Sequence, residues 1–324
     1  MLFRSLDLKN SFGNAERIFL QWQQLQIKSP RLNVAYSQPY MFGTSFGMES
    51  QFGLFKKDSS FLQIKATMAI TRQGLNNHTT TLGFSYFQNT LLEGAADTNR
   101  LIQTQKMPDD IDSKSMNLML GFSGRTTNHP ENPNKGCEYQ QTVWVGNRKV
   151  IENQTLLSVK GKENFVRKFY DSVGANTYQV KYIGSIQKYI PLGKYSVLMF
   201  GSQLGYYQSR HIFRTDLFQI GGNRLLRGFD EESIFANRYA VFTAEYRLQL
   251  SELGYAQIFT DMGMVNNQLK LTGQNTRYTG MGIGMVYPTE NGRLRISLAV
   301  GNRSDVPFVL RQSVRIHLGY VNYF

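Results

Sequence analysis

The stretch Ile220–Ser233, which reads IGGNRLLRGFDEES, interrupts a long series of segments in which polar and apolar residues alternate. It exceeds an ordinary hairpin turn, which has about two to five residues. Glycine tolerates positive φ and the close approach of another backbone, and this stretch contains Gly221, Gly222 and Gly228. Its two arginines lie among leucine and phenylalanine side chains. These features predict a loop that folds back into an enclosed space.

Alternation with a period of two residues, which is typical of β-strands with one apolar face, recurs on both sides of this stretch. In Phe61–Ile70, for example, Leu62 and Ile64 would face lipid, whereas Gln63 and Lys65 would face inward. Ten such segments precede the stretch, near Leu6–Lys9, Ile18–Gln23, Leu32–Ser37, Thr44–Phe55, Phe61–Ile70, Thr80–Phe87, Met116–Ser123, Tyr139–Val150, Tyr178–Tyr182 and Leu198–Tyr206. Five follow it, at Tyr239–Leu250, Tyr255–Val265, Tyr278–Tyr287, Leu294–Gly301 and Ser313–Phe324.

The composition agrees with a barrel that crosses a membrane by strands. The mean hydropathy is -0.35, and the sequence has no unbroken apolar run of about 18 residues, which excludes a helical span. Barrel strands alternate lipid-facing and lumen-facing residues, so such a chain is hydrophilic on average. Aromatic residues make up 13% of the chain, as expected of girdles at both membrane interfaces. The predicted fold class is therefore all-β, a transmembrane antiparallel β-barrel of about fifteen strands with a long loop folded into its lumen.

The segment Leu226, Arg227, Gly228 and Phe229 resembles the LRGF loop of the BamA superfamily of bacterial outer-membrane barrels, the bacterial surface antigen family. The following segment Tyr239–Arg247 resembles the strand after that loop. The resemblance implies a barrel of about sixteen strands, an even number as single-chain barrels need. It also implies a protein of the bacterial outer membrane that inserts or translocates other polypeptides, with a weakly paired seam that templates an incoming strand.

The resemblance implies partners for the loop arginine as well, because in this family it pairs with acidic residues on the two strands after the loop. The matching positions are Glu245 and Asp261. Alternation places both on the inward face if Phe242 and Ile258 face lipid. The alternative is that the two carboxylates are ordinary solvated charges of a pore.

The two ends of the sequence support a barrel domain that occupies residues 1–324. The last segment carries Leu318, Tyr320 and Phe324 on one face and resembles the C-terminal aromatic signal for barrel insertion. The first residues, Met1–Gln26, lack the basic, apolar and small-residue regions of a secretory signal. We therefore expect that the signal peptide, any soluble N-terminal domains and the first strand are absent from this sequence.

Charge and motif content predict a non-enzymatic protein. The net charge is +13, but the basic residues are scattered along the strands rather than clustered, so nucleic acid is not an expected partner. We expect them to be lumen and loop charges, some of which face anionic lipid or lipopolysaccharide. Cys137 is the single cysteine, which excludes a disulfide framework and a multi-cysteine metal site. No nucleophile elbow, zinc-protease motif or P-loop occurs, so we predict no catalytic residues, no metal and no cofactor.

The resemblance leaves more than one function open. An assembly factor would act on unfolded client polypeptides together with lipoproteins of an assembly machinery, whereas a two-partner secretion transporter would export one large substrate. From other classes, a passive porin or the barrel anchor of a surface enzyme would also fit a transmembrane barrel. A porin would lack the LRGF loop, and an enzyme fusion would carry its catalytic domain upstream.

Overall fold

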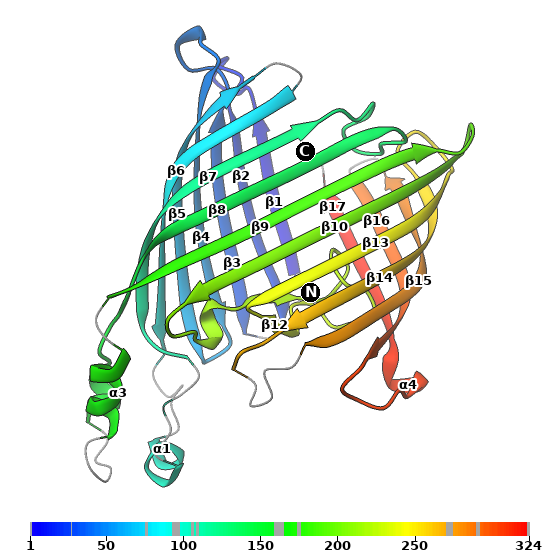
Figure 1. The fold of residues 1–324 in the computed structure, drawn as a ribbon. Coiled ribbons are helices and arrows are strands. Elements are labelled where there is room, and N and C mark those ends of the chain that lie inside the picture. The colour runs from blue at the N-terminus through cyan, green and yellow to red at the C-terminus, as the bar shows by residue number, and fades with distance from the viewer. Residues whose placement is uncertain are drawn as a thin grey trace.

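The computed structural model describes residues 2–26, 28–74, 77–92, 98–104, 107, 110–158, 165–173, 176–269, 275–289 and 292–322. Its main feature is one antiparallel sheet of fifteen strands, curled into a barrel wall (Figure 1). Ten strands come before the central stretch: β1 (Leu2–Lys9), β2 (Arg17–Gln26), β3 (Ser29–Gln38), β4 (Phe46–Lys57), β5 (Phe61–Gln73), β6 (His78–Leu91), β7 (Ser113–Arg125), β8 (Gly136–Val150), β9 (Asn176–Pro191) and β10 (Ser196–Ser209). Five follow it: β13 (Arg238–Gln249), β14 (Tyr255–Asn266), β15 (Thr276–Thr289), β16 (Gly292–Arg303) and β17 (Val314–Asn322).

The strand count and its division into ten and five agree with the sequence prediction. The reason is the alternation itself, because successive side chains of a strand point to opposite faces. On β14, Ile258 and Met262 are exposed on the outer face, whereas Gln257 and Asp261 are buried on the inner face. An apolar outer surface and a polar interior are the arrangement that a membrane barrel requires.

The order of strands in the sheet follows the sequence, so successive connections alternate between the two ends of the barrel. The short helical turn in the connection between β3 and β4 lies at one end, whereas the longer connections after β6, β8, β10 and β16, which carry the other helices, all lie at the opposite end (Figure 1). Outer-membrane barrels have longer loops outside the cell and short turns on the periplasmic side, so this is the extracellular end. The helical elements are η1 (Met41–Gly43), α1 (Thr98–Thr104), α2 (Gln154–Leu157), α3 (Phe165–Val173), η4 (Arg214–Asp216) and α4 (Leu310–Ser313). Within the described ranges, none of the helices has the length and apolar character needed to cross a membrane.

Two elements at the extracellular end add to the predicted strands. The first is α3, whose Val166 and Tyr170 are buried against neighbouring extracellular loops. The last strand begins one residue later than predicted, at Val314. Ser313 ends α4 instead, and its hydroxyl donates a hydrogen bond to the carbonyl of Val309.

The stretch between β10 and β13, residues 210–237, forms the central loop. It starts with η4 and continues through a short antiparallel ribbon of β11 (Phe218–Ile220) and β12 (Ile234–Ala236). Buried apolar residues of the loop pack against inward side chains of the wall, and the cluster comprises Tyr207, Phe218, Ile220, Leu226, Ile234, Ala236, Tyr239, Val241, Val265 and Tyr278. The loop therefore folds into the barrel, as the glycine-rich sequence predicted.

The strands β1 and β17 are the two edges of the sheet, and within the described residues no backbone pairing joins them. The wall is thus an antiparallel sheet with an open seam. In Figure 1, β1 is drawn in blue and β17 in red, behind the green strands β8 to β10.

Candidate functional site in the barrel lumen

The tip of the central loop approaches the wall so closely that only glycine fits at several positions. Gly228 has a φ of 94°, and a Cβ added there would lie 2.7 Å from the backbone nitrogen of Gly301 on β16. A Cβ on Gly280 of β15 would lie 2.0 Å from the carbonyl oxygen of Arg227. Leu226 also has a positive φ, 61°, which costs a residue with a side chain about 1–3 kcal/mol. The backbone of the loop tip therefore packs directly against the backbone of strands β15 and β16.

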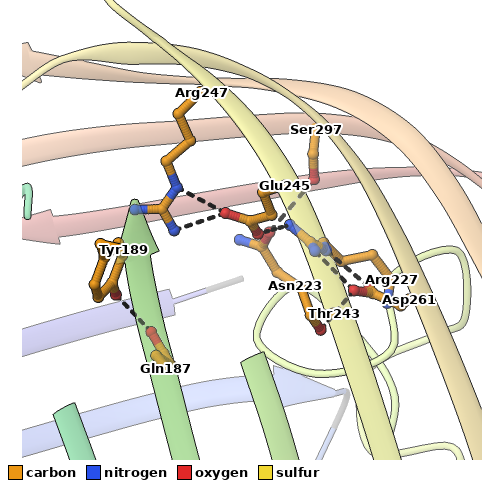
Figure 2. Close-up of polar contacts among 9 residues, drawn as sticks. All are labelled: Gln187, Tyr189, Asn223, Arg227, Thr243, Glu245, Arg247, Asp261 and Ser297. Carbon is orange, nitrogen blue, oxygen red and sulfur yellow. Dashed lines mark hydrogen bonds and ion pairs between the residues drawn. The ribbon is translucent and has the colours of Figure 1, made fainter. Parts of the chain in front are cut away.

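Arg227 lies at this tip and is held by two carboxylates (Figure 2). Its Nη1 is 2.6 Å from Glu245 Oε1, and its Nη2 is 2.7 Å from Asp261 Oδ1. Its Nε and its backbone nitrogen each donate to Asp261 Oδ2 at 2.8 Å. The guanidinium carbon also lies 3.6 Å from the ring centroid of Phe259 on β14. Planar, forked pairing of this kind is the strong form of a charge-assisted hydrogen bond.

The two carboxylates have further partners on the wall, so each charged group that contacts Arg227 also has a second polar partner. Arg247 donates to Glu245 Oε2 from Nε at 2.8 Å and lies 2.6 Å from it at Nη2. Thr243 donates its hydroxyl to Asp261 Oδ1 at 2.8 Å. The network therefore contains two cations and two anions. The side chains of Arg227, Glu245 and Asp261 are only 8%, 6% and 1% exposed, so they lie away from bulk solvent.

The residues after Arg227 reach the last strands of the sheet. The backbone nitrogen of Gly228 donates to His317 Nε2 on β17 at 3.2 Å, so that ring nitrogen acts as the acceptor and the proton is on Nδ1. The ring of Phe229 packs edge-on against Tyr278 of β15, with centroids 5.2 Å apart. The LRGF segment thus contacts β13 to β17, which is the whole part of the wall that follows the loop.

Three further ion pairs, which the sequence did not predict, fix the loop to other strands. Arg148 of β8 pairs with Asp216 of η4 and also donates to the carbonyl of His211 at 2.6 Å. Arg31 of β3 and Glu232 form two hydrogen bonds of 2.8 and 3.0 Å. Arg315 of β17 and Asp230 form the third, with Arg315 Nε 2.7 Å from Asp230 Oδ1.

An arginine at an inward position of a strand was the available signal for these pairs, because a buried cation needs an anionic partner. It does not identify that partner. Arg148 and Asp216 are 68 residues apart in the sequence, and Arg31 and Glu232 are 201 apart. No local spacing or strand register relates such positions before the course of the loop is known.

A sequence profile described as the Omp85 superfamily domain matches residues 10–319. The chain belongs to the Omp85 superfamily. This membership confirms the resemblance drawn from the LRGF segment, and it identifies the protein as a β-barrel of the bacterial outer membrane.

Solved structures share the fold of this Omp85 barrel. BamA from Haemophilus ducreyi lacking POTRA domains 1–3 superposes with a TM-score of 0.66 at 16% identity, covering 98% of this chain and 65% of that one. CdiB from Acinetobacter baumannii gives 0.64 at 13% identity, covering 98% and 55%. CdiB from Escherichia coli gives 0.62 at 11% identity, covering 98% and 58%. The chain spans between about half and two thirds of these proteins. A comparison with curated proteins found no match.

The Omp85 barrel thus brings Arg227, Glu245 and Asp261 into direct contact, with Leu226, Gly228 and Phe229 beside them. Gly221 and Gly222 have positive φ values of 104° and 113° at the base of the loop tip. Leu318 and Tyr320 lie on the outer face of β17, 61% and 42% exposed. Phe324, the remaining residue of the predicted insertion signal, lies outside the described residues.

Proposed function

We propose that this Omp85 barrel inserts or translocates polypeptides at the outer membrane, without covalent chemistry. The observation that carries the proposal is a lumen loop whose tip is fixed to β13 and β14 and also reaches β17, an open edge of the sheet. An exposed strand edge pairs with an incoming extended segment through main-chain hydrogen bonds. The edge of β17, supported from inside by the central loop, is the surface that would template a client strand.

The contacts of the loop support a seam that opens at one place. Arg227 joins the loop to β13 and β14 by buried bonds, and those strands are joined to each other over their full length. β17 pairs with β16 over nine residue pairs and meets the loop at His317 and Arg315. We infer that the loop keeps the second half of the barrel in register while β17 exchanges partners.

We further infer that one more strand pairs with β1 and β17 in the complete barrel. The described sheet has fifteen strands and two edges, whereas single-chain bacterial barrels have an even number. Unpaired backbone groups in lipid cost several kcal/mol each. The folding yield and the leakage of liposomes, measured with and without a preceding strand, test this inference. Equal values would contradict it.

The second candidate function is two-partner secretion, which is favoured by the likeness to two CdiB structures. In that case the loop would have to leave the lumen to free a path for the substrate, whereas in assembly it would stay in place. The clients also differ, because assembly ends with a folded barrel in the membrane and secretion ends with a passenger on the other side of it. For either function we propose that the apolar outer face contacts lipid and that basic loop residues face lipopolysaccharide. Client polypeptides are the partners in both cases, and lipoproteins of an assembly machinery only in the assembly function.

Proteoliposomes that contain the chain distinguish these candidates. For the assembly function we expect faster appearance of heat-modifiable, protease-protected client barrel than in empty liposomes. For secretion we expect a denatured passenger to become protected inside the vesicles, with no folding of client barrels. Rates equal to those of empty liposomes for both substrates would contradict the proposal, provided the chain itself is heat-modifiable.

A further inference from the structure

A second region of the lumen lies on the other side of the central loop from Arg227. It is a cavity of about 280 Å³ between the first limb of the loop and the inner faces of strands β3 to β10. Lys65 of β5 and Lys181 of β9 line it from the wall, and Thr215, Phe218 and Gln219 line it from the loop. We call this cavity the lysine chamber.

The charges around the lysine chamber do not balance. Its two carboxylates already have cations, because Asp216 pairs with Arg148 and Glu232 pairs with Arg31. No carboxylate among the described residues lies within 4.0 Å of the ammonium groups of Lys65 or Lys181.

The two lysines therefore face one cavity whose carboxylates are already paired with arginines, although Asp216 lies near enough to attract Lys181. The ammonium of Lys181 is 4.7 Å from the ring centroid of Phe218, a contact with an aromatic face that supplies only weak compensation. The two lysines are also close enough to repel each other electrostatically. Lys65 is exposed to the lumen and Lys181 is half-buried, so both ammonium groups are open to an anion that enters from solution.

The chamber also presents polar groups suited to an anion. The hydroxyl of Thr215, in a side chain that is nearly inaccessible to solvent, has no hydrogen-bond partner among the described residues. Each ammonium carries three N–H donors and no acceptor. A buried donor without a partner calls for a ligand or an ordered water. Donors from the wall and from the loop thus converge on one space.

We propose that the lysine chamber binds a small oxyanion of the phosphate class between Lys65 and Lys181. Lysine binds phosphate as a point charge, and two ammonium groups match the two negative charges of a phosphate near neutral pH. A volume of about 280 Å³ corresponds to roughly nine water molecules of about 30 Å³ each, which admits a hydrated phosphate but no folded partner. The bound anion would join β5 and β9 to η4 and β11, and the inference does not depend on the proposed function.

Trp144 lines the same chamber, and the chain has only one other tryptophan. Its fluorescence is therefore a direct probe of occupancy. The purified chain in a phosphate-free, non-ionic detergent is titrated with inorganic phosphate at constant ionic strength, with chloride as the reference anion. We expect a saturable fluorescence change with phosphate and none with chloride, together with a higher midpoint of thermal unfolding.

The variants Lys65→Gln and Lys181→Gln each remove one ammonium and should weaken phosphate binding about tenfold or more, since each loses a charge-assisted contact. Lys188→Gln is the matched control, because Lys188 is exposed on the same strand β9 but on the outer face. Heat-modifiable migration of every variant shows that the barrel is folded. Titration with a short-chain phosphatidic acid distinguishes lipid phosphate from free phosphate as the source, and saturation by either supports an oxyanion site.

Three outcomes would overturn the proposal. The first is a response that does not saturate or is the same in chloride. The second is binding that survives in the folded double variant of Lys65 and Lys181. The third is equal weakening by Lys188→Gln, which would indicate a general effect of net charge.

Discussion

Arg227 and Asp230 are three residues apart on the same loop, and each forms an ion pair with the barrel wall, yet their surroundings differ. Arg227 and its partners Glu245 and Asp261 are at most 8% exposed. Asp230 is 66% exposed, and its partner Arg315 is 36% exposed. Exposed pairs contribute about 0–1 kcal/mol, whereas breaking a buried pair from one side costs roughly 3–5 kcal/mol. The loop is thus bound firmly to β13 and β14 and only tethered to β17.

The other two pairs fall between these extremes and complete a ranking by burial. Arg148 and Asp216 are 1% and 6% exposed, and Arg31 and Glu232 are 25% and 23% exposed. Judged by the burial of its ion pairs, the loop is held firmly where it enters from β10 and where it turns at its tip. Its return limb is held more loosely, by Arg31 of β3 and by Arg315 of the edge strand β17.

The largest expected effect is that of Arg227→Ala, which leaves Glu245 and Asp261 facing each other without their shared cation. The cost is roughly 3–5 kcal/mol, reduced to the extent that water enters the lumen. The loop tip should become sensitive to protease while the barrel, held by its own hydrogen-bond ladder, stays heat-modifiable. Arg227→Lys should restore protection only in part, because an ammonium lacks the planar fork.

Arg224→Ala is the control for this variant, because Arg224 is exposed in the same loop and no described residue forms an ion pair with it. We expect it to leave the protection of the loop unchanged. Equal sensitivity of the two variants, or no change in either, would show that Arg227 is not the anchor of the tip.

The second prediction concerns the buried pair of Arg148 and Asp216, and it tests whether the two anchors of the loop act independently. Asp216→Asn removes a charge but keeps the shape, which leaves the guanidinium of Arg148 with the carbonyl of His211 as a remaining acceptor. We expect a loss below the roughly 3–5 kcal/mol of an emptied buried pair, about 1.5–3 kcal/mol as for a lost hydrogen bond to a charged group, with faster hydrogen exchange in residues 213–220. Residues 226–229 should stay protected, because the tip has its own network. Loss of protection over the whole loop would mean that the two anchors act as one unit.

The contrast between these pairs also shows how far the sequence determines the structure. Period-two alternation placed the fifteen strands and the inward positions of Glu245 and Asp261, because the pleat fixes which side chains share a face. The contact of these carboxylates with Arg227 came from a resemblance, since alternation alone does not say where a loop tip ends. Neither alternation nor the resemblance predicted the contact between Arg148 and Asp216. Their contact depends on the path of η4 through the lumen, which long-range packing determines.

The third prediction addresses the half-buried pair of Arg31 and Glu232. Glu232→Gln should destabilise the loop by about 1 kcal/mol or less, because Arg31 keeps its contact with the ring of Phe55 at 4.4 Å. The midpoint of thermal unfolding should fall by less than for Asp216→Asn. High salt should reduce the difference between Glu232→Gln and the parent chain. A loss as large as that of Asp216→Asn would break the ranking by burial.

The smallest effect is expected for Asp230→Asn, at the tether to β17. Both partners are substantially exposed, so removal of the charge should change the free energy of unfolding by roughly 0–1 kcal/mol, and by less at high salt. The contact from the backbone of Gly228 to His317 remains, so the loop still touches β17. If β17 is the strand that exchanges partners, a weak tether is what the mechanism needs, and Asp230→Asn should keep or raise the rate of client insertion. A variant that loses both loop protection and insertion as Arg227→Ala does would show that the loop is anchored to the seam itself, and the division between a firm and a mobile side of the barrel would be wrong.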